Sequence, residues 1–171
     1  MIESASSAET AQEAAWIVSE PSYESDVLNP DLAISPWQVH RDFAYDLVGF
    51  ARPRLIVELG VHYGCSYFAF CQAVKDRRLQ TRIVGVDTWE GDEHCGLYGG
   101  EVYELVARTR AEFFDDDRFV LRRARFDQAV EAFEDGSIDL LHIDGFHAYD
   151  VVRADFNTWL PKLARDGIVL M

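Results

Sequence analysis

Two residues near the end of one buried segment could carry out proton chemistry. Asp144 ends the apolar run IDLLHID, and His147 follows three residues later. An aspartate in such a place can bind a hard cation or orient a substrate hydroxyl, and a histidine, which titrates near neutral pH, can accept the proton. An aspartate that caps a helix beside a surface histidine would have the same spacing. The position at the end of a buried segment favours chemistry, so Asp144 and His147 are the candidate catalytic residues. His142, inside the run, is interpreted as a core histidine.

A second set of residues surrounds a glycine turn in LIVELGVHYG, residues 55–64. A buried strand followed by a sharp turn leaves backbone amides and a helix N-terminus facing outward, where an adenosine-bearing ligand can dock. Gly60 and Gly64 have the spacing GxxxG, whereas nicotinamide dinucleotides favour GxGxxG. A strand-to-helix turn that binds nothing would carry the same glycines. Glu58 is costly to bury unless it is paired or binds a ligand, and it could meet a cationic group.

Asp87 ends the next apolar run, RIVGVD. A carboxylate at the end of a second strand can accept hydrogen bonds from both hydroxyls of a ribose, although aspartate is also a common cap. Trp89 could pack on the adenine or methionine side of a ligand, or belong to the core. The polar, glycine-rich stretch that follows is too long for a plain turn and predicts a lid or binding loop. Residues 92–95 within it lack the spacing typical of zinc ligands.

These residues need a parallel sheet to bring them together, and the pattern of the chain predicts one. From residue 55 onward, apolar runs typical of strands alternate with segments of helical periodicity. The expected strands are 55–59, 82–87, 118–124, 138–144 and 167–171. Right-handed crossovers then give an α/β fold, a Rossmann-like parallel sheet of five strands with helices on both faces. The strand order should reverse between the first and fourth strands, which predicts a ligand crevice lined by residues 60–66, 87–89, 125–127 and 144–147.

The remaining segments predict the boundaries of the domain. Residues 1–30 are rich in Ser, Ala and Glu and are interrupted by two prolines, which predicts a flexible leader or linker before a domain over residues 31–171. Ser35 followed by proline is typical of a helix start. The apolar residues of 152–163 predict the helix after the fourth strand, closed by residues 165–167.

The composition limits the classes of partner. The chain has 171 residues, enough for one domain with a core, and its formal net charge is −14. That charge repels phosphate backbones and anionic lipid, so neither nucleic acid nor a membrane is an expected partner. Three cysteines without a CxxC pair favour reduced thiols, and the acidic N-terminus lacks the features of a signal peptide. The cytoplasm is therefore the expected location.

Three long segments together resemble class I S-adenosylmethionine-dependent methyltransferases. They are VELGVHYGCSYFAFC, VGVDTWEGDEHCGLYGGEVYE and SIDLLHIDGFHAYDVVRADFNTWLPKLARDGIVLM. The sequence is similar in particular to the macrocin O-methyltransferase-like branch and to methyltransferase modules found beside bacterial glycosyltransferases. The resemblance implies that S-adenosylmethionine is held at its methionine end by Glu58, Gly60, Gly64 and Ser66, at its ribose by Asp87 and at its adenine by Asp127.

The resemblance also implies the reaction, methyl transfer to a hydroxyl of a sugar or small natural product. Asp144 would bind Mg²⁺ or the substrate, and His147 would be the general base. In this branch a His-Asp pair after the fifth strand completes the magnesium site and two more strands follow, whereas this chain ends at Met171. We therefore expect a fold truncated before its sixth and seventh strands, a piece of a longer protein that could be inactive alone. The alternative is a non-catalytic S-adenosylmethionine-binding or interaction module of a glycan-assembly protein. Expected partners are the sugar or small-molecule substrate, a neighbouring glycosyltransferase and a second copy of the chain.

Overall fold

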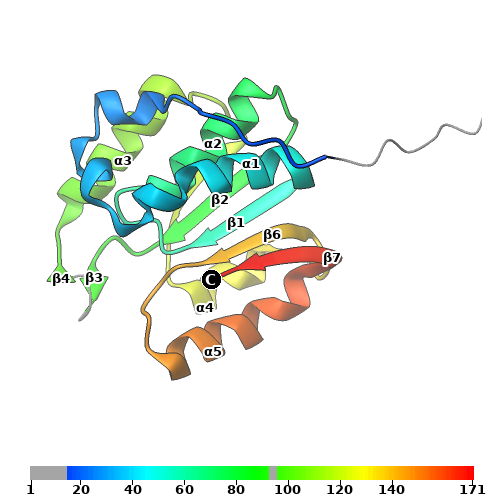
Figure 1. Cartoon of the computed structure of the whole chain (residues 1–171). Helices are drawn as coiled ribbons and strands as arrows, with labels where there is room; N and C mark the ends of the chain where they lie inside the picture. The colour runs from blue at the N-terminus through cyan, green and yellow to red at the C-terminus, as the bar shows by residue number, and fades with distance from the viewer. Residues whose placement is uncertain (1–14, 93–95) are drawn as a thin grey trace, which may run out of the picture.

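A five-stranded parallel sheet forms the centre of the computed structural model, which describes residues 15–92 and 96–171 (Figure 1). The strand order is β5-β2-β1-β6-β7, and all four pairings are parallel. The strands are β1 (Leu55–Leu59), β2 (Arg82–Asp87), β5 (Phe119–Arg123), β6 (Ile138–Ile143) and β7 (Leu163–Leu170). The predicted Rossmann-like α/β sheet is confirmed, and its order reverses between β1 and β6 as expected.

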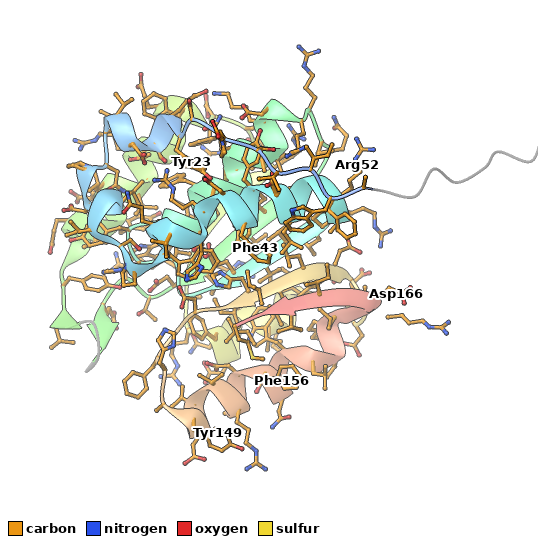
Figure 2. All side chains as sticks on the ribbon, in the orientation of Figure 1. Tyr23, Phe43, Arg52, Tyr149, Phe156 and Asp166 are labelled. Atoms are coloured by element: carbon orange, nitrogen blue, oxygen red, sulfur yellow. The ribbon has the colours of Figure 1, made fainter. Side chains whose placement is uncertain are left out.

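Helices cover both faces of the sheet because its central strands are apolar on both sides (Figure 1). In β1, Ile56 belongs to the core beneath α1 (Arg41–Ala51), α2 (Cys65–Asp76) and α3 (Gly100–Phe113). Its neighbours Val57 and Leu59 point to the opposite core, beneath α4 (Phe126–Ala129) and α5 (Tyr149–Trp159). On α5, Phe156 packs against that second core while Tyr149 is exposed at the start of the helix (Figure 2).

The chain before α1 lies against the first helix layer. It forms three short 3-10 helices, η1 (Glu24–Val27), η2 (Pro30–Ile34) and η3 (Pro36–His40). The backbone N–H of Ser19 donates to Asp46 at 3.0 Å, and Arg41 pairs with Asp26 at 2.7 Å. Ser35 begins η3 as expected, since its hydroxyl accepts from the backbone N–H of Trp37 at 3.2 Å. Of the predicted leader, residues 1–14 lie outside the described residues, and contacts with the domain are present from Trp16 onward.

The C-terminal helix and strand differ from the predicted boundaries. The helix was expected to extend to Leu163, but α5 ends at Trp159 and the short η5 (Leu160–Lys162) follows. Pro161 explains the change, because its ring cannot continue an α-helix hydrogen-bond pattern. Strand β7 therefore begins at Leu163 rather than at Gly167, and its pairing with β6 shifts register after Ile138.

The long polar loop after β2 contains a short antiparallel pair, β3 (Gly91–Asp92) and β4 (Gly96–Leu97). Residues 92–95 could be read as a metal cluster but lack zinc spacing, and residues 93–95 lie outside the described residues. The thiols of Cys65 and Cys71 are free and buried. Within the described part of the chain, none of the helices combines the length and apolar character needed to cross a bilayer.

Candidate active site

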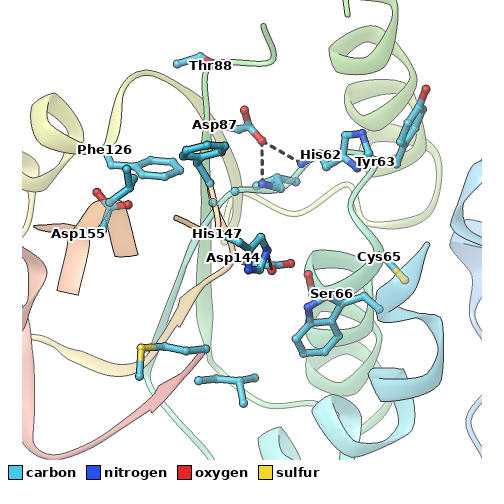
Figure 3. Close-up of a pocket in the computed structure, with 18 of the residues that line it drawn as sticks. His62, Tyr63, Cys65, Ser66, Asp87, Thr88, Phe126, Asp144, His147 and Asp155 are labelled. Carbon is cyan, nitrogen blue, oxygen red and sulfur yellow. Dashed lines mark hydrogen bonds and ion pairs between the residues drawn. The ribbon is translucent and has the colours of Figure 1, made fainter. Parts of the chain in front are cut away.

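A cavity of about 1070 Å³ opens at the carboxyl ends of the central strands. All four segments predicted from the strand order contribute to its wall, including Gly60, Asp87, Asp127 and Asp144. Figure 3 shows Asp144 and His147 near the middle of this region, with Phe126 and Asp155 on one side and Cys65 and Ser66 on the other. The crevice predicted from the topology is therefore present.

The turn after β1 requires glycine at two positions. Gly60 has φ +92, and a Cβ placed there would collide with the backbone carbonyl of Asp144. Gly64 has φ +89, and a Cβ there would press on the ring of Phe68. Both φ values lie in the left-handed region that favours glycine. The turn can thus pass close to the end of β6, which brings the predicted donor loop beside the predicted catalytic aspartate.

Asp87 is the acceptor that holds this turn in place. One carboxylate oxygen, Oδ2, accepts from the backbone N–H groups of Val61 and His62 at 2.8 and 2.9 Å (Figure 3). The other, Oδ1, accepts from the backbone N–H of Trp89 at 2.7 Å. A carboxylate offers about four lone-pair positions, so these three bonds leave room for about one more. The contact of Asp87 with the hydroxyls of a ribose stays a prediction.

Glu58 and His142 form a buried pair beneath the cavity. They are register partners on β1 and β6, and Glu58 Oε1 lies 2.8 Å from His142 Nδ1. The hydroxyl of Ser66 donates to the same carboxylate oxygen. Burial raises the pKa of Glu58, although hydrogen bonds from His142 and Ser66 oppose that rise. Ser66 lines the cavity whereas Glu58 does not, so the direct ligand contact predicted for Glu58 stays a prediction, and its contact in the structure is with the Ser66 hydroxyl.

The core position predicted for His142 is confirmed only in part. The ring is completely buried and packs edge-on against Trp37, with a centroid distance of 4.6 Å. Its Nδ1 has Glu58 as a partner, but Nε2 has no hydrogen-bond partner among the described residues. The same is true of Glu58 Oε2, so this buried network is only half satisfied.

Asp144 and His147 form the pair that the spacing suggested. His147 Nε2 lies 3.1 Å from Asp144 Oδ1, and both residues line the cavity. Burial raises the pKa of Asp144, while the neighbouring His142 and His147 lower it. The imidazole of His147 is more than half exposed, so it can reach a bound molecule. A carboxylate that orients a histidine at the wall of a cavity is an arrangement suited to proton abstraction.

Two other predicted ligand contacts are modified by the structure. Trp89 is fully buried and does not line the cavity; its indole N–H donates to the carbonyl of His62 at 3.0 Å, and its ring contacts Tyr103. The φ of +52 at Trp89 turns the side chain inward, so it supports the glycine turn from behind. Asp127 does line the cavity, but both of its oxygens are bonded to Arg125, at 3.0 and 2.9 Å.

The magnesium role predicted for Asp144 is not supported by its surroundings. Among residues 15–92 and 96–171 there is no group of three or more His, Cys, Asp or Glu side chains arranged to hold a metal ion. Magnesium requires near-octahedral oxygen coordination, often with more than one carboxylate or phosphate. The described residues do not provide that donor set, and no step below is derived through a metal.

Several residues of the cavity wall were not predicted from the sequence. They come from the segment before β1 and from α5, and include Trp37, His40, Phe43 and Asp155. Trp37 and Phe43 have the apolar character of core residues, so the sequence offers no signal that they line a cavity. Asp155 lies within a helical pattern, where an acidic residue is normally assigned to the solvent face.

Comparisons with known proteins agree with this fold and extend it. A family model described as "Methyltransferase domain" matches residues 57–171. An uncharacterized protein of Sinorhizobium fredii is 49% identical over 136 residues, which are 80% of this chain and 15% of that protein. This chain thus spans a small part of the length of that relative.

Two solved structures have a similar fold. A methyltransferase of Podospora anserina, solved with bound SAH, has a TM-score of 0.63 at 19% identity and covers 85% of this chain and 56% of its own. An O-methyltransferase of Bacillus cereus in complex with SAH has a TM-score of 0.61 at 19% identity, over 85% of this chain and 63% of its own. At these identities the similarity shows a shared fold.

Proposed function

Because this chain belongs to the methyltransferase-domain family, we propose that it binds S-adenosylmethionine and transfers the methyl group to a hydroxyl of a sugar or small natural product. The observation that carries the proposal is the pairing of an acidic cavity with the Asp144–His147 pair inside it. The first suits a cationic donor, and the second suits a hydroxyl acceptor. The SAH bound in the two structural neighbours is the form that such a donor takes after it has lost its methyl group.

The charge of the cavity supports S-adenosylmethionine over a dinucleotide. Along the described part of the wall there are four aspartates, at positions 87, 127, 144 and 155, and a single arginine. The charge of that arginine, Arg125, is offset by its ion pair with Asp127. A nicotinamide dinucleotide would bring its anionic pyrophosphate into this field, whereas S-adenosylmethionine brings a sulfonium and an ammonium group. The turn after β1 also lacks the GxGxxG spacing that nicotinamide dinucleotides favour.

The proposed donor contacts follow from the hydrogen-bond donors and acceptors that remain free on the side chains of the wall. The Ser66 hydroxyl uses its single proton on Glu58, so toward the cavity it can only accept. It therefore suits the ammonium group at the methionine end of the donor. Asp87 can accept from one ribose hydroxyl with its remaining lone pair, and Asp127, which also lines the wall, is assigned to the adenine.

S-adenosylmethionine, when bound, supplies a methyl group already activated on a positively charged sulfur. The protein then has two tasks, to align the acceptor hydroxyl and to remove its proton. In the tautomer whose Nε2–H donates to Asp144 Oδ1, the lone pair of His147 is on Nδ1, and that atom can take the proton. Asp144 fixes the imidazole and stabilises the imidazolium that forms. Asp144 is therefore a positioning residue for the general base His147.

Calorimetric titration with SAH and with NADH, followed by a radiolabelled methyl-transfer assay, tests this proposal. We expect SAH to bind in the micromolar range and NADH not to bind. The Asp87→Ala variant should bind SAH much more weakly, and His147→Ala should retain the wild-type affinity, since in this proposal His147 faces the acceptor. Folded protein that binds no SAH would overturn the donor assignment. Protein that binds SAH but transfers no methyl group to any hydroxylated acceptor would instead be a non-catalytic binding module.

A further inference from the structure

The wall of the cavity has two chemically different halves. Near β2 and α4 it carries Asp87 and Asp127, whereas η3 and α1 contribute Trp37, His40 and Phe43. The whole cavity, about 1070 Å³, slightly exceeds the roughly 300–1,000 Å³ of sites for one small ligand. Methyl transfer requires two molecules side by side. If the acidic half holds the donor, as proposed above, the aromatic half is left for the acceptor.

We propose that the acceptor is an uncharged sugar ring whose apolar face lies against Trp37 and Phe43. This inference rests on the proposed function, and it specifies both the acceptor class and the residues that select it. Phe43 lies on the side of α1 that faces β6 and β7 (Figure 2). The two aromatic residues and the Asp144–His147 pair line the same cavity, so a ring held by the former can present a hydroxyl to the latter.

Both aromatic rings are held by neighbours on one side. Trp37 is half-buried and contacts the ring of His142 edge-on, at 4.6 Å and 71°. Phe43 is 46% exposed and is stacked on Trp16, at 5.6 Å and 27°. Side chains fixed in this way lose little conformational entropy on binding a ligand, so their exposed surface is prepared to pack against a flat molecule.

Polar groups surround this aromatic surface, and their distribution favours a sugar over a phenol. The His40 ring lies 5.5 Å from that of Trp37, and Ser35 also lines the cavity. A pyranose has an apolar face of C–H groups and hydroxyls around its edge, so it can use the rings and the polar groups together. A phenol has two apolar faces and few hydroxyls, and would leave these polar groups without a partner.

The charge of the cavity wall favours a neutral glycoside over a nucleoside diphosphate sugar. In the described wall the one arginine is paired on the donor side, and the carboxylates outnumber it four to one. The pyrophosphate of a nucleotide-activated sugar would therefore meet a wall whose fixed charge is mainly negative. The acceptor should therefore be a neutral glycoside rather than a nucleoside diphosphate sugar.

The aromatic surface lies outside the region that the family model matches. That region begins at residue 57, whereas Trp37 and Phe43 precede it. The two structural neighbours cover 85% of this chain, more than residues 57–171 alone, so part of the segment before residue 57 is shared with them.

Two phenylalanines of α1 provide a matched pair for the test. Phe43 and Phe50 are seven residues apart on one face, are 46% and 40% exposed, and each lies 5.6 Å from the ring of Trp16. In the described structure, Phe43 lines the cavity and Phe50 does not. Replacing either by alanine removes a similar exposed ring, so a difference between the variants reports on the cavity.

The experiment is saturation-transfer NMR on protein saturated with SAH, using methyl glucoside, UDP-glucose and catechol as probes. We expect the ring protons of methyl glucoside to receive saturation from the wild type and from Phe50→Ala. The Phe43→Ala variant should bind it about tenfold more weakly, as for loss of one aromatic stacking contact. UDP-glucose, which carries the same ring on a pyrophosphate, should give no signal.

Each alternative outcome has a definite meaning. Failure of SAH itself to bind in calorimetry would overturn the proposed function. If SAH binds, then the absence of a methyl glucoside signal, preferential binding of UDP-glucose or catechol, or equal binding by Phe43→Ala and Phe50→Ala would each overturn the present inference and leave the donor site intact. Trp37→Ala serves as the second variant, with the same expected loss.

Discussion

Asp87 and Asp144 end two central strands of the same sheet, but their carboxylates have different uses. Asp87 is 8% exposed and accepts three backbone N–H groups. Asp144 is more open, with its side chain 24% exposed, and its carboxylate faces one histidine. In the sequence both are an acidic residue after a buried run, and the local difference between them is His147, three residues after Asp144. The distinction comes from what the next segment does.

After Asp87 the chain folds back, so the carboxylate becomes the centre of the turn that shapes the donor loop. After Asp144 the chain leads into α5, and the nearest functional group is the His147 imidazole. A carboxylate with three backbone partners mainly holds structure, whereas one with more lone pairs to spare can take part in chemistry. In the proposed function, the end of β2 therefore holds the donor and the end of β6 activates the acceptor.

Removing the imidazole should have the largest effect on turnover. We expect His147→Ala to lower kcat about 10²–10⁴-fold, the usual contribution of a general base. The Kd for SAH and the thermal midpoint should stay close to those of the wild type, because the side chain is more than half exposed. Radiolabelled methyl transfer to an acceptor that the wild type uses measures kcat. Tyr149→Ala, an exposed control outside the cavity wall, should be fully active. A kcat for His147→Ala within threefold of the wild type would remove this residue from the mechanism.

Replacing Asp87 and Asp144 by alanine, one at a time, should show most clearly how the two strand ends differ in their contribution to stability. Asp87→Ala leaves three backbone N–H groups without their acceptor, at a cost of about 1–3 kcal/mol for each group that stays buried. We expect it to lower the free energy of unfolding by about 3 kcal/mol or more and to weaken SAH binding about 100-fold. Asp144→Ala removes a bond to one half-exposed side chain, so its unfolding free energy should change by about 1 kcal/mol or less. Urea denaturation and calorimetry measure both. Equal destabilisation by the two substitutions would contradict the division of roles.

The sequence predicted the strand ends because hydrophobic runs that stop at an acid are a local signal. It could not predict what each acid contacts. The partner of Glu58 is His142, 84 residues away, and it is adjacent only because β1 and β6 pair in this register. The turn of the chain at Trp89, with its positive φ, is likewise set by packing, and this turn buries a side chain that the sequence placed near the ligand.

The acceptor half of the cavity was beyond sequence reasoning for a related physical reason. Trp37 lies in the short 3-10 helix η3 and Phe43 in α1, and their directions depend on how η3 and α1 pack against α2 and how Trp37 meets His142 of the sheet. Their types indicate only that they are buried somewhere. The donor half could be predicted because its residues follow strands whose ends must meet at one edge of a parallel sheet.

Glu58 is the third acidic residue of the central strands, and its role can be tested through the pH dependence of the unfolding free energy. Burial raises its pKa in the folded state, so the folded protein binds a proton more readily than the unfolded chain. The associated stability is present below the unfolded pKa near 4.5 and is lost as the pH rises through the folded value. The unfolding free energy of the wild type should therefore fall relative to that of Glu58→Gln across this window, by up to about 1.4 kcal/mol per pH unit. Urea denaturation of both proteins at several pH values measures the difference. A difference that does not depend on pH would mean that Glu58 is not the titrating group.

The smallest effect is expected at Asp127, the exposed aspartate of the donor half. Both of its oxygens are bonded to Arg125, and the pair is exposed, with side chains 60% and 67% accessible. Hydrogen bonds from Arg125 lower the pKa of Asp127, so it is charged at neutral pH and adds to the negative field of the cavity. Asp127→Ala should weaken SAM binding by only about threefold, far less than Asp87→Ala, and should leave the thermal midpoint unchanged.

Replacing Arg125, the partner of Asp127, should have the opposite effect on the affinity for SAM, and this contrast is the test. Arg125→Ala leaves the Asp127 carboxylate without its counter-charge and makes the wall more negative, so binding of cationic SAM should become slightly tighter. SAH lacks the sulfonium charge and should respond less to either change. Calorimetry with both ligands at low salt, where exposed charges are least screened, measures the contrast. If Arg125→Ala weakens SAM binding as much as Asp127→Ala does, the pair acts as a structural clamp on the loop after β5. The negative charge of the donor half would then reside at Asp87, Asp144 and Asp155.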